Sequence, residues 1–450
     1  SASDADIALT TTTNAFTGAV SLNTTGGGGN AEIYIGTTNL VFGTSSVGGN
    51  LTVTTGSGSA VTQTGVLTVD GATDITANDG GNNIRLEGQE NVLTGAVSLD
   101  GWNVRLTNAK ALELGTIDSR ALELTARGAI TQTVPSVITS VGSSTIIAQN
   151  SAGNTDYDVT LENAANDFRG ALILTAGNVR VRDTDDVELG ASTVSGIYKL
   201  TTGGAVSDSG DLDIEGATTI LASGSNVVLD RATHDFTGAV GVTGAAVELV
   251  DANGIVLGDS TVSGAYQVTA TAGGDITDAG VLDIDGAATF TAANGRSITL
   301  DSSNTFSGTV AFSSGGTLTN VEVKDTTAFV LAETANLTLS GNLTVTTGGA
   351  LTDTNVISVA GLTTITATGQ VVALNNASNN FGTILFGSSS NAVSSVEVVD
   401  TNAIAIGASK STGNFTVTAG DDVTDSGTVT VGGNLSVTTS ASDGLINMGT

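Results

Sequence analysis

Short stretches of alternating apolar and polar residues follow one another along the chain. From Ala171 onward the sequence reads "ALILTA", "NVRVRD", "DVELGAS" and "YKLTT", with Gly, Asn, Asp or Ser between the apolar pieces. In a β-strand, this alternation sends Val, Ile and Leu to one face and Thr, Asp or Arg to the other. No amphipathic helical period of useful length interrupts the pattern. The sequence therefore predicts an all-β protein made of short strands.

The strands belong to tandem repeats. A first anchor, "NAFTG" at Asn14, returns in variant form at Asn91, Asn166, His234, Asn304 and Asn379. A second anchor, of the "TQTG" or "TDAG" type, keeps step with it at Thr62, Thr131, Ser207, Thr277, Thr352 and Thr424. The opening "SASD" recurs at Ser440, so six repeats average about 73 residues. Self-similarity at a fixed period is the signature of a repeat architecture.

Two further anchors recur in some of the copies. One is "STVSG", which begins at Ser192 and again at Ser260. The other is an acidic turn after a strand, whose first carboxylate lies at Asp183, Asp251, Asp325 and Asp400. Asp side chains in such turns bond to the backbone two residues later, so we interpret this carboxylate as part of an Asx turn.

The strand lengths and the period together predict the architecture. Eight or nine strands per repeat suit about three rungs of a three-sided parallel coil, with roughly 24 residues in each rung. We therefore predict a parallel β-helix, or β-solenoid, in which residues 1–450 form a single continuous domain cut from a longer array. Inward side chains stack between rungs, and one inward slot per repeat is predicted to hold a large residue, at Phe16, Leu93, Phe168, Phe236, Phe306 and Phe381.

The composition agrees with a narrow β structure and limits the function. The chain has 60 glycines, which suit tight corners with left-handed or bulged backbone, and one proline, because parallel rungs use their backbone N–H groups. A formal net charge of -31 provides no basic surface for a nucleic acid. No run of about 18 apolar residues is present to span a membrane. The absence of cysteine fits a protein exported from a bacterium.

His234 is the only histidine of the chain, and it tests the case for an enzyme. A Ser-His-Asp arrangement would need it beside a serine nucleophile, but no G-x-S-x-G elbow accompanies it. It also occupies the register of the Asn in the first anchor. We interpret His234 as one copy's variant of that Asn, and we expect no catalytic residue, no cofactor and no enzymatic activity.

The densest group of carboxylates is formed by Asp183, Asp185 and Asp186, with Arg180 and Arg182 beside them. Clustered carboxylates with a basic residue are typical of carbohydrate lyases on β-helices, and carboxylates also bind calcium. The same turn carries a single Asp in the later copies, and the chain repeats itself evenly instead of concentrating its differences in one region. The three aspartates are weak calcium candidates, and a carbohydrate-active lyase is an alternative function.

Two other surface features suggest binding. Stretches such as "LTVTT" at Leu51 and Leu343 resemble the threonine arrays of ice-binding proteins, but they recur about once per repeat, whereas ice binding needs threonine on every rung. Trp102 takes the position of a glycine in the next copy and could stack on a glycan. A glycan-binding face is therefore a second alternative, and an ice-binding protein a third.

The repeats resemble a known family. Runs such as "GNLTVTTGGALTDTNVISVAGLTTITA" from Gly341, and "HDFTGAV" at His234 followed by "VELVDAN", are similar to the β-strand repeats of giant bacterial exoproteins, the filamentous-haemagglutinin-like adhesins. The resemblance implies a right-handed β-helical shaft, export across a Gram-negative outer membrane, and a role in attachment, coating or filament formation. These 450 residues show no Asn-Pro motif of the family's N-terminal secretion domain, and Pro135 does not replace it, so we expect this chain to be the shaft.

These observations together predict an extracellular structural rod. We expect it to form a surface filament, a coat or an adhesin shaft, through head-to-tail or side-by-side self-association, because exposed strand edges pair with further strands. A glycan or another host-surface molecule is a candidate ligand. We expect no cofactor beyond weakly bound calcium, no nucleic acid and no membrane span.

Overall fold

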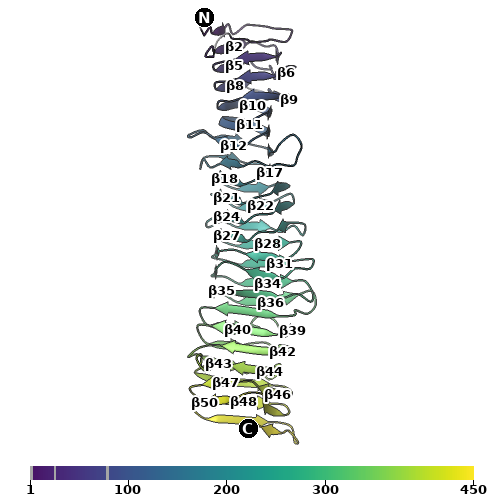
Figure 1. Ribbon diagram of the computed structural model, residues 1–450, viewed down its shortest axis with the longest axis vertical. Coiled ribbons are helices and arrows are strands. Elements are labelled where there is room, and N and C mark those ends of the chain that lie inside the picture. The colour runs from purple at the N-terminus through teal and green to yellow at the C-terminus, as the bar shows by residue number, and fades with distance from the viewer. Residues whose placement is uncertain (1–3, 25–26, 78–80, 450) are drawn as a thin grey trace. The chain divides into compact units, whose positions relative to one another are not determined.

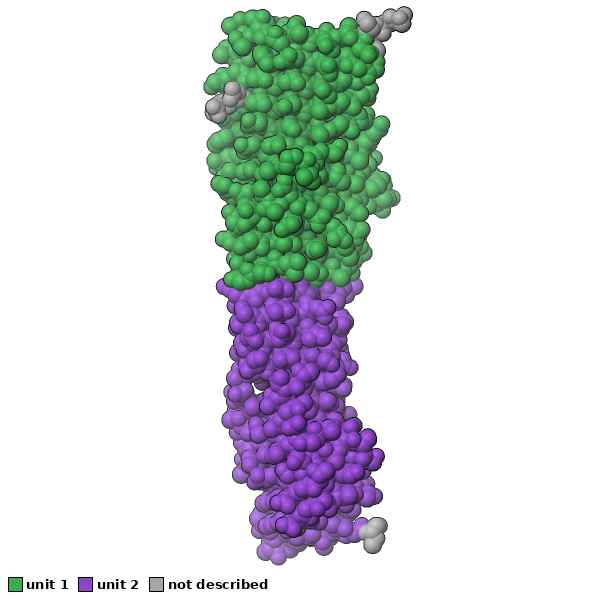
Figure 2. Space-filling view, turned by 90° about the vertical axis from the view of Figure 1, so that its left-hand side faces the viewer, with its two compact units in different colours: residues 1–225 green, residues 226–450 purple. Residues whose placement is uncertain are grey.

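The computed structural model describes residues 4–24, 27–77 and 81–449, and every helix or strand assigned in these ranges is a β-strand. The chain forms two compact units, residues 1–225 and residues 226–450, which Figure 2 colours separately. Within each unit, the strands stack in parallel rungs (Figure 1). The prediction of an all-β parallel solenoid is confirmed. The single continuous domain expected for residues 1–450 stays a prediction, and the first three residues of "SASD" lie outside the described ranges.

A typical rung of unit 1 contains one strand of five residues and two strands of three. Two successive rungs consist of β18 (Val179–Asp183), β19 (Val187–Leu189), β20 (Ser192–Val194), β21 (Tyr198–Thr202), β22 (Val206–Asp208) and β23 (Leu212–Ile214). Each strand pairs in parallel with its counterpart in the next rung, as Val181 does with Leu200. The backbone N–H and C=O groups of one rung therefore find partners in the neighbouring rungs.

A repeat is not a whole number of turns. In unit 2, β28 (Val247–Asp251) belongs to a column of paired strands with β31 (Tyr266–Ala270), β34 (Ala288–Ala292) and β36 (Val310–Ser314). The equivalent strand one repeat later, β37 (Val321–Asp325), pairs with β35 (Ile298–Phe306) in a different column. About 21 turns in six repeats correspond to about three and a half turns per repeat. The coil therefore has more and shorter rungs than the three of roughly 24 residues that the sequence predicts.

The core consists of the inward positions of the strands, stacked from rung to rung. Val181, Leu200 and Ile220 form one such ladder, and each is at most 2% exposed. The five predicted large residues Leu93, Phe168, Phe236, Phe306 and Phe381 are buried, and Phe16 is half-buried. Because each ladder brings similar side chains into contact, stacked Val, Ile and Leu residues fill the narrow interior.

Glycine is needed at the corners mainly because neighbouring rungs pack closely there. A Cβ atom added to Gly210 would lie 2.0 Å from the backbone nitrogen of Ala191, in the rung before it. Left-handed backbone, the reason expected from the sequence, applies to eight glycines among the described residues, for example Gly58 with a φ of 85°. The corners therefore need glycine because adjacent rungs touch there, and only in part because of an unusual φ.

Asparagine ladders hold other corners. The side-chain oxygen of Asn30 accepts the backbone N–H of Asn50 at 2.8 Å, and Asn50 accepts the N–H of Ala72 at 2.8 Å in the following rung. In unit 2, Asn320 and Asn342 repeat the arrangement. These bonds explain why Asn precedes so many strands of the sequence, since each one fixes the start of the next rung.

One segment of unit 1 departs from the short-strand pattern. Here β9 (Ile84–Leu93), β10 (Val97–Asn108) and β11 (Leu112–Ala126) continue through the corners as long strands. The offset between paired residues is also smaller, because Leu106 lies opposite Leu124, whereas Ile75 lies opposite Leu99. We call residues 84–126 the long-strand segment, and residues 179–214, from β18 to β23, the short-strand segment.

Candidate functional site

The repeated acidic turn caps the backbone of the preceding part of the coil. Asp183 is 4% exposed, and its Oδ2 accepts the backbone N–H of Phe168 at 2.8 Å. Its Oδ1 accepts the N–H of Asp185 at 2.9 Å, which is the expected Asx turn. The same two bonds are made by the turn's aspartate in three later copies, at Asp251, Asp325 and Asp400. The motif residue therefore joins its own turn to the predicted large residue of the repeat.

Burial shifts the acidity of these caps. Removal from water raises the pKa of Asp183 to about 6, although the two backbone N–H donors act in the opposite direction. Burial also raises the pKa of Asp251 and of Asp400. In the long-strand segment the equivalent cap is uncharged, because Asn108 Oδ1 accepts the N–H of Leu93 at 2.9 Å. The caps therefore differ in charge while keeping the same bond.

The serine of the "STVSG" anchor caps a backbone N–H that lies between two strand pairings. Leu172 of β17 (Leu172–Ala176) pairs with β19, and Thr175 pairs with β20. This five-residue strand therefore lies over two strands of three residues. Leu174 falls between these pairs, and its N–H donates to Ser192 Oγ at 3.0 Å. The same hydroxyl donates to the carbonyl of Gly190, two residues earlier. Matching bonds are made by Ser45, Ser260 and Ser409.

The asparagine of the first anchor is a third buried cap. Asn166 is fully buried, and its Oδ1 accepts the N–H of Ile138 at 3.0 Å while its amide exchanges two bonds with Gln132 of the second anchor. In a later copy, Asn304 caps Leu282 and donates to Asp278 at 2.7 Å. The two anchors therefore keep step because their side chains bind each other, a pairing that the sequence analysis did not identify.

His234 lies where its register places it. The residue is 0% exposed, and its ring centroid is 5.6 Å from that of Phe236. Its backbone carbonyl accepts the N–H of Ala252 at 2.7 Å, in the acidic turn of the same copy. A fully buried ring in a core slot is not accessible to a substrate.

The weak calcium candidates do not converge. Both carboxylate oxygens of Asp183 accept backbone N–H groups, and Asp186 Oδ1 accepts the N–H of Ala205 at 2.7 Å. Asp183 faces inward, whereas Arg180 and Arg182 are exposed on the other face of β18. Within residues 4–24, 27–77 and 81–449, no group of three or more His, Cys, Asp or Glu side chains is placed to hold a metal ion.

The threonine stretches do not form a continuous array. On β5 (Leu51–Thr55), Thr52 lies between Glu32 and Asp74 of the neighbouring rungs, and Thr54 lies between Tyr34 and Thr76. Mixed charged and aromatic neighbours break the regular spacing of hydroxyls and methyl groups that an ice-binding surface requires. These threonines are outward strand residues.

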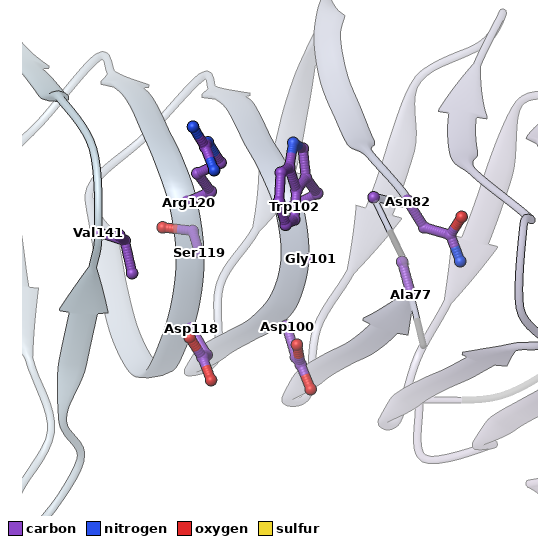
Figure 3. Close-up of a pocket in the computed structure, with 10 residues that line it drawn as sticks. Ala77, Asn82, Asp100, Gly101, Trp102, Asp118, Ser119, Arg120 and Val141 are labelled. Carbon is purple, nitrogen blue, oxygen red and sulfur yellow. The ribbon is translucent and has the colours of Figure 1, made fainter. Parts of the chain in front are cut away.

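Trp102 is part of a surface pocket in the long-strand segment. The pocket has a volume of about 260 Å³ and lies over the corner where β10 and β11 continue without a break. Figure 3 shows Trp102 between Arg120 and Asn82, with Asp100 and Asp118 along a second side. The guanidinium carbon of Arg120 lies 4.8 Å from the centre of the indole ring, and Trp102 is 45% exposed. The sequence identified Trp102 but not the residues that surround it, since these come from neighbouring rungs.

Comparisons with known proteins identify the repeat and no relative of known function. The model of a family described as repeats of unknown function, DUF5649, matches six times, at residues 28–100, 101–175, 176–243, 244–313, 318–386 and 393–449. Neither the curated proteins nor the solved structures contain a match. The six matches confirm the number of repeats that the anchors predict.

Proposed function

Because this chain belongs to the DUF5649 family of repeats, we propose that it is a structural protein whose repeats build a scaffold outside the cell. The observation that carries the proposal is the use of the motif residues. Asp183, Ser192 and Asn166 each accept a backbone N–H of a neighbouring strand, as do their counterparts in other copies. A repeat whose anchor side chains bond to the backbone of its own coil is suited to maintaining a shape.

The location and assembly are the finer part of the proposal. The resemblance to filamentous-haemagglutinin-like repeats supports export from a Gram-negative bacterium and a place on the cell surface. The strong negative charge supports solubility there. We propose that the rungs stack into a filament or coat by head-to-tail or side-by-side association, without enzymatic activity and without a cofactor other than weakly bound calcium.

Electron microscopy of the purified 450-residue chain tests the assembly. Samples at low and high salt, each with and without calcium, are examined for filaments or lateral arrays. We expect ordered assemblies in at least one condition, favoured by salt because salt screens the repulsion between negatively charged copies. Dispersed single particles in all four conditions would contradict self-association.

Adhesion is a second function, and one observation favours it. An adhesin needs a surface that recognises another molecule, in addition to side chains that support the fold. The pocket at Trp102 has this character, because it combines a half-exposed aromatic ring with charged groups from two rungs. An adhesive face on a structural shaft combines both functions in one chain.

A further inference from the structure

We propose that the pocket at Trp102 is a binding site for a neutral sugar ring. The inference deepens the adhesive function proposed above and rests on it, while the scaffold function does not depend on it. Four features of the pocket carry the argument: its shape, its aromatic wall, its hydrogen-bonding groups and its charge.

The shape is set by the strand register. Asp100 of β10 lies opposite Asp118 of β11, and the chain continues through Gly101 and Ser119 to Trp102 and Arg120. Two pairs of outward side chains therefore line the pocket, and each pair joins two adjacent rungs. One pair is Asp100 with Asp118, the other is Trp102 with Arg120, and Gly101 and Ser119 lie between the pairs. The volume of about 260 Å³ lies just below the range of about 300–1,000 Å³ that accommodates drug-sized ligands, and suits a single ring.

The aromatic wall offers an apolar surface to a ring. Trp102 is 45% exposed, and its backbone N–H is bound to the carbonyl of Asn82 at 2.6 Å, which fixes the residue against the rung above. Arg120 of the neighbouring strand β11 lies beside the indole (Figure 3). An indole held in this way presents area without losing side-chain entropy on binding, and the C–H face of a pyranose can pack against it.

The polar groups match the hydroxyls of a sugar. The carboxylate of Asp118 accepts hydrogen bonds and the guanidinium of Arg120 donates them, while the amide of Asn82 already donates to the carbonyl of Gly56 at 3.3 Å. Ser119 also lines the pocket, is 4% exposed, and carries a hydroxyl with no hydrogen-bond partner within the described part of the chain. A buried hydroxyl without a partner costs free energy, so a ligand hydroxyl near Ser119 would remove that cost.

Charge selects the kind of sugar. Asp100 and Asp118 occupy neighbouring rungs, in a chain with a formal net charge of -31, so an acidic sugar would be repelled. An organic cation would be attracted by the carboxylates, but the guanidinium of Arg120 beside the indole would repel a second positive charge there. A neutral ring meets neither obstacle, and its hydroxyls can use the acceptors and donors together.

The single tryptophan makes the test direct, because its fluorescence reports this pocket alone. The full chain is titrated with four neutral oligosaccharides, maltotetraose, cellotetraose, mannotetraose and chitotetraose, and in parallel with tetragalacturonate and with choline. We expect a saturable change in emission with at least one neutral oligosaccharide. A response to tetragalacturonate or choline alone would overturn the proposal, and so would the absence of a saturable response to every probe.

Variants locate the binding. Asp118→Asn is expected to weaken the response at least about fivefold, since it removes a charged acceptor, and Trp102→Ala at least about tenfold when binding is followed by calorimetry. Asp283→Asn is the matched control, because Asp283 is an exposed strand residue of β33 (Leu282–Ile284) in unit 2. Equal affinity of all three variants would place the ligand elsewhere and refute the site. Electron microscopy of Trp102→Ala keeps the two proposals separate, because loss of sugar binding should leave the assemblies unchanged.

Discussion

The long-strand and short-strand segments of unit 1 form their corners in two ways. In the short-strand segment the chain turns through glycines, and a Cβ at Gly210 would collide with the backbone of Ala191. In the long-strand segment the strand itself bends, and side chains such as Trp102 and Arg120 emerge at the corner. A corner closed by glycine brings the rungs together and leaves no group to bind with. A corner that stays extended can carry side chains, and this difference separates a scaffold rung from a candidate binding rung.

Charges follow the same division. Three arginines form ion pairs with glutamates: Arg85 with Glu87, Arg105 with Glu123, and Arg127 with Glu90. All three lie in or next to the long-strand segment. The sequence predicts a chain that repeats evenly, whereas in the structure the long strands and these three ion pairs gather in one region.

The largest effect is expected for a corner glycine of the short-strand segment. Gly210→Ala should lower the free energy of unfolding by about 3 kcal/mol, because the added carbon would lie 2.0 Å from a backbone nitrogen that cannot move alone. Gly88→Ala in the long-strand segment adds the same carbon where nothing lies within 4 Å, and should change stability by less than about 0.5 kcal/mol. Urea denaturation of both variants measures the difference, and equal midpoints would refute this account of the corners.

The serine cap should be the next most costly to remove. Ser192→Ala leaves the buried N–H of Leu174 without an acceptor, so we expect a loss of about 1–3 kcal/mol. In the long-strand segment Ile117 replaces this serine, two residues after Gly115, and the strand continues instead. Ser98→Ala is the control, since Ser98 accepts an exposed N–H from Thr116 and should cost less than about 0.5 kcal/mol. Hydrogen exchange at Leu174 would show whether the loss is local.

The pH dependence should differ between the charged and uncharged caps. The pKa of Asp183 is raised to about 6 in the fold, so the folded state binds a proton more readily than the unfolded chain. Stability should therefore rise as the pH falls from about 7 toward 4, and the Asp183→Asn variant should lose about 1–2 kcal/mol of this gain. Asn108→Asp should introduce the same dependence into the long-strand segment. Thermal unfolding between pH 4 and pH 7 measures both changes, and parallel curves for wild type and Asp183→Asn would contradict the assignment.

The smallest effect concerns the ion pairs. Arg105 and Glu123 lie 3.3 Å apart, and both side chains are more than 40% exposed, so solvent screens their attraction. Arg105→Gln should change the free energy of unfolding by less than about 0.5 kcal/mol, and less again at high salt. A loss above 1 kcal/mol in urea denaturation would mean that the arginines of the long-strand segment hold the bent corner in place.

The period of the chain was accessible from the sequence, because each anchor is a residue type that a specific bond requires. Asp183 and Ser192 recur since few other side chains can accept a backbone N–H at those positions. The number of turns was not accessible, because it depends on how one long strand lies over two short ones, and that pairing joins residues far apart in the sequence.

The pocket shows a similar limit. Trp102 stands out in the sequence as the only tryptophan. Its neighbours Asp118 and Arg120 stand out only once the register is known, and the offset from β10 to β11 is shorter than the one before it. The composition therefore identified Trp102, whereas the residues that face it, Asp118 and Arg120, were identified only from the structure.

The part of a turn left over in each repeat has a geometric consequence for recognition. A side chain that recurs once per repeat changes sides from one copy to the next, as Asp251, Asp325 and Asp400 do, because their strands fall in three different columns. Copies in register thus distribute their equivalent side chains over three aspects of the coil. A one-sided contact cannot arise from the repeat itself, and requires a copy that differs from the others, as the copy containing Trp102 does.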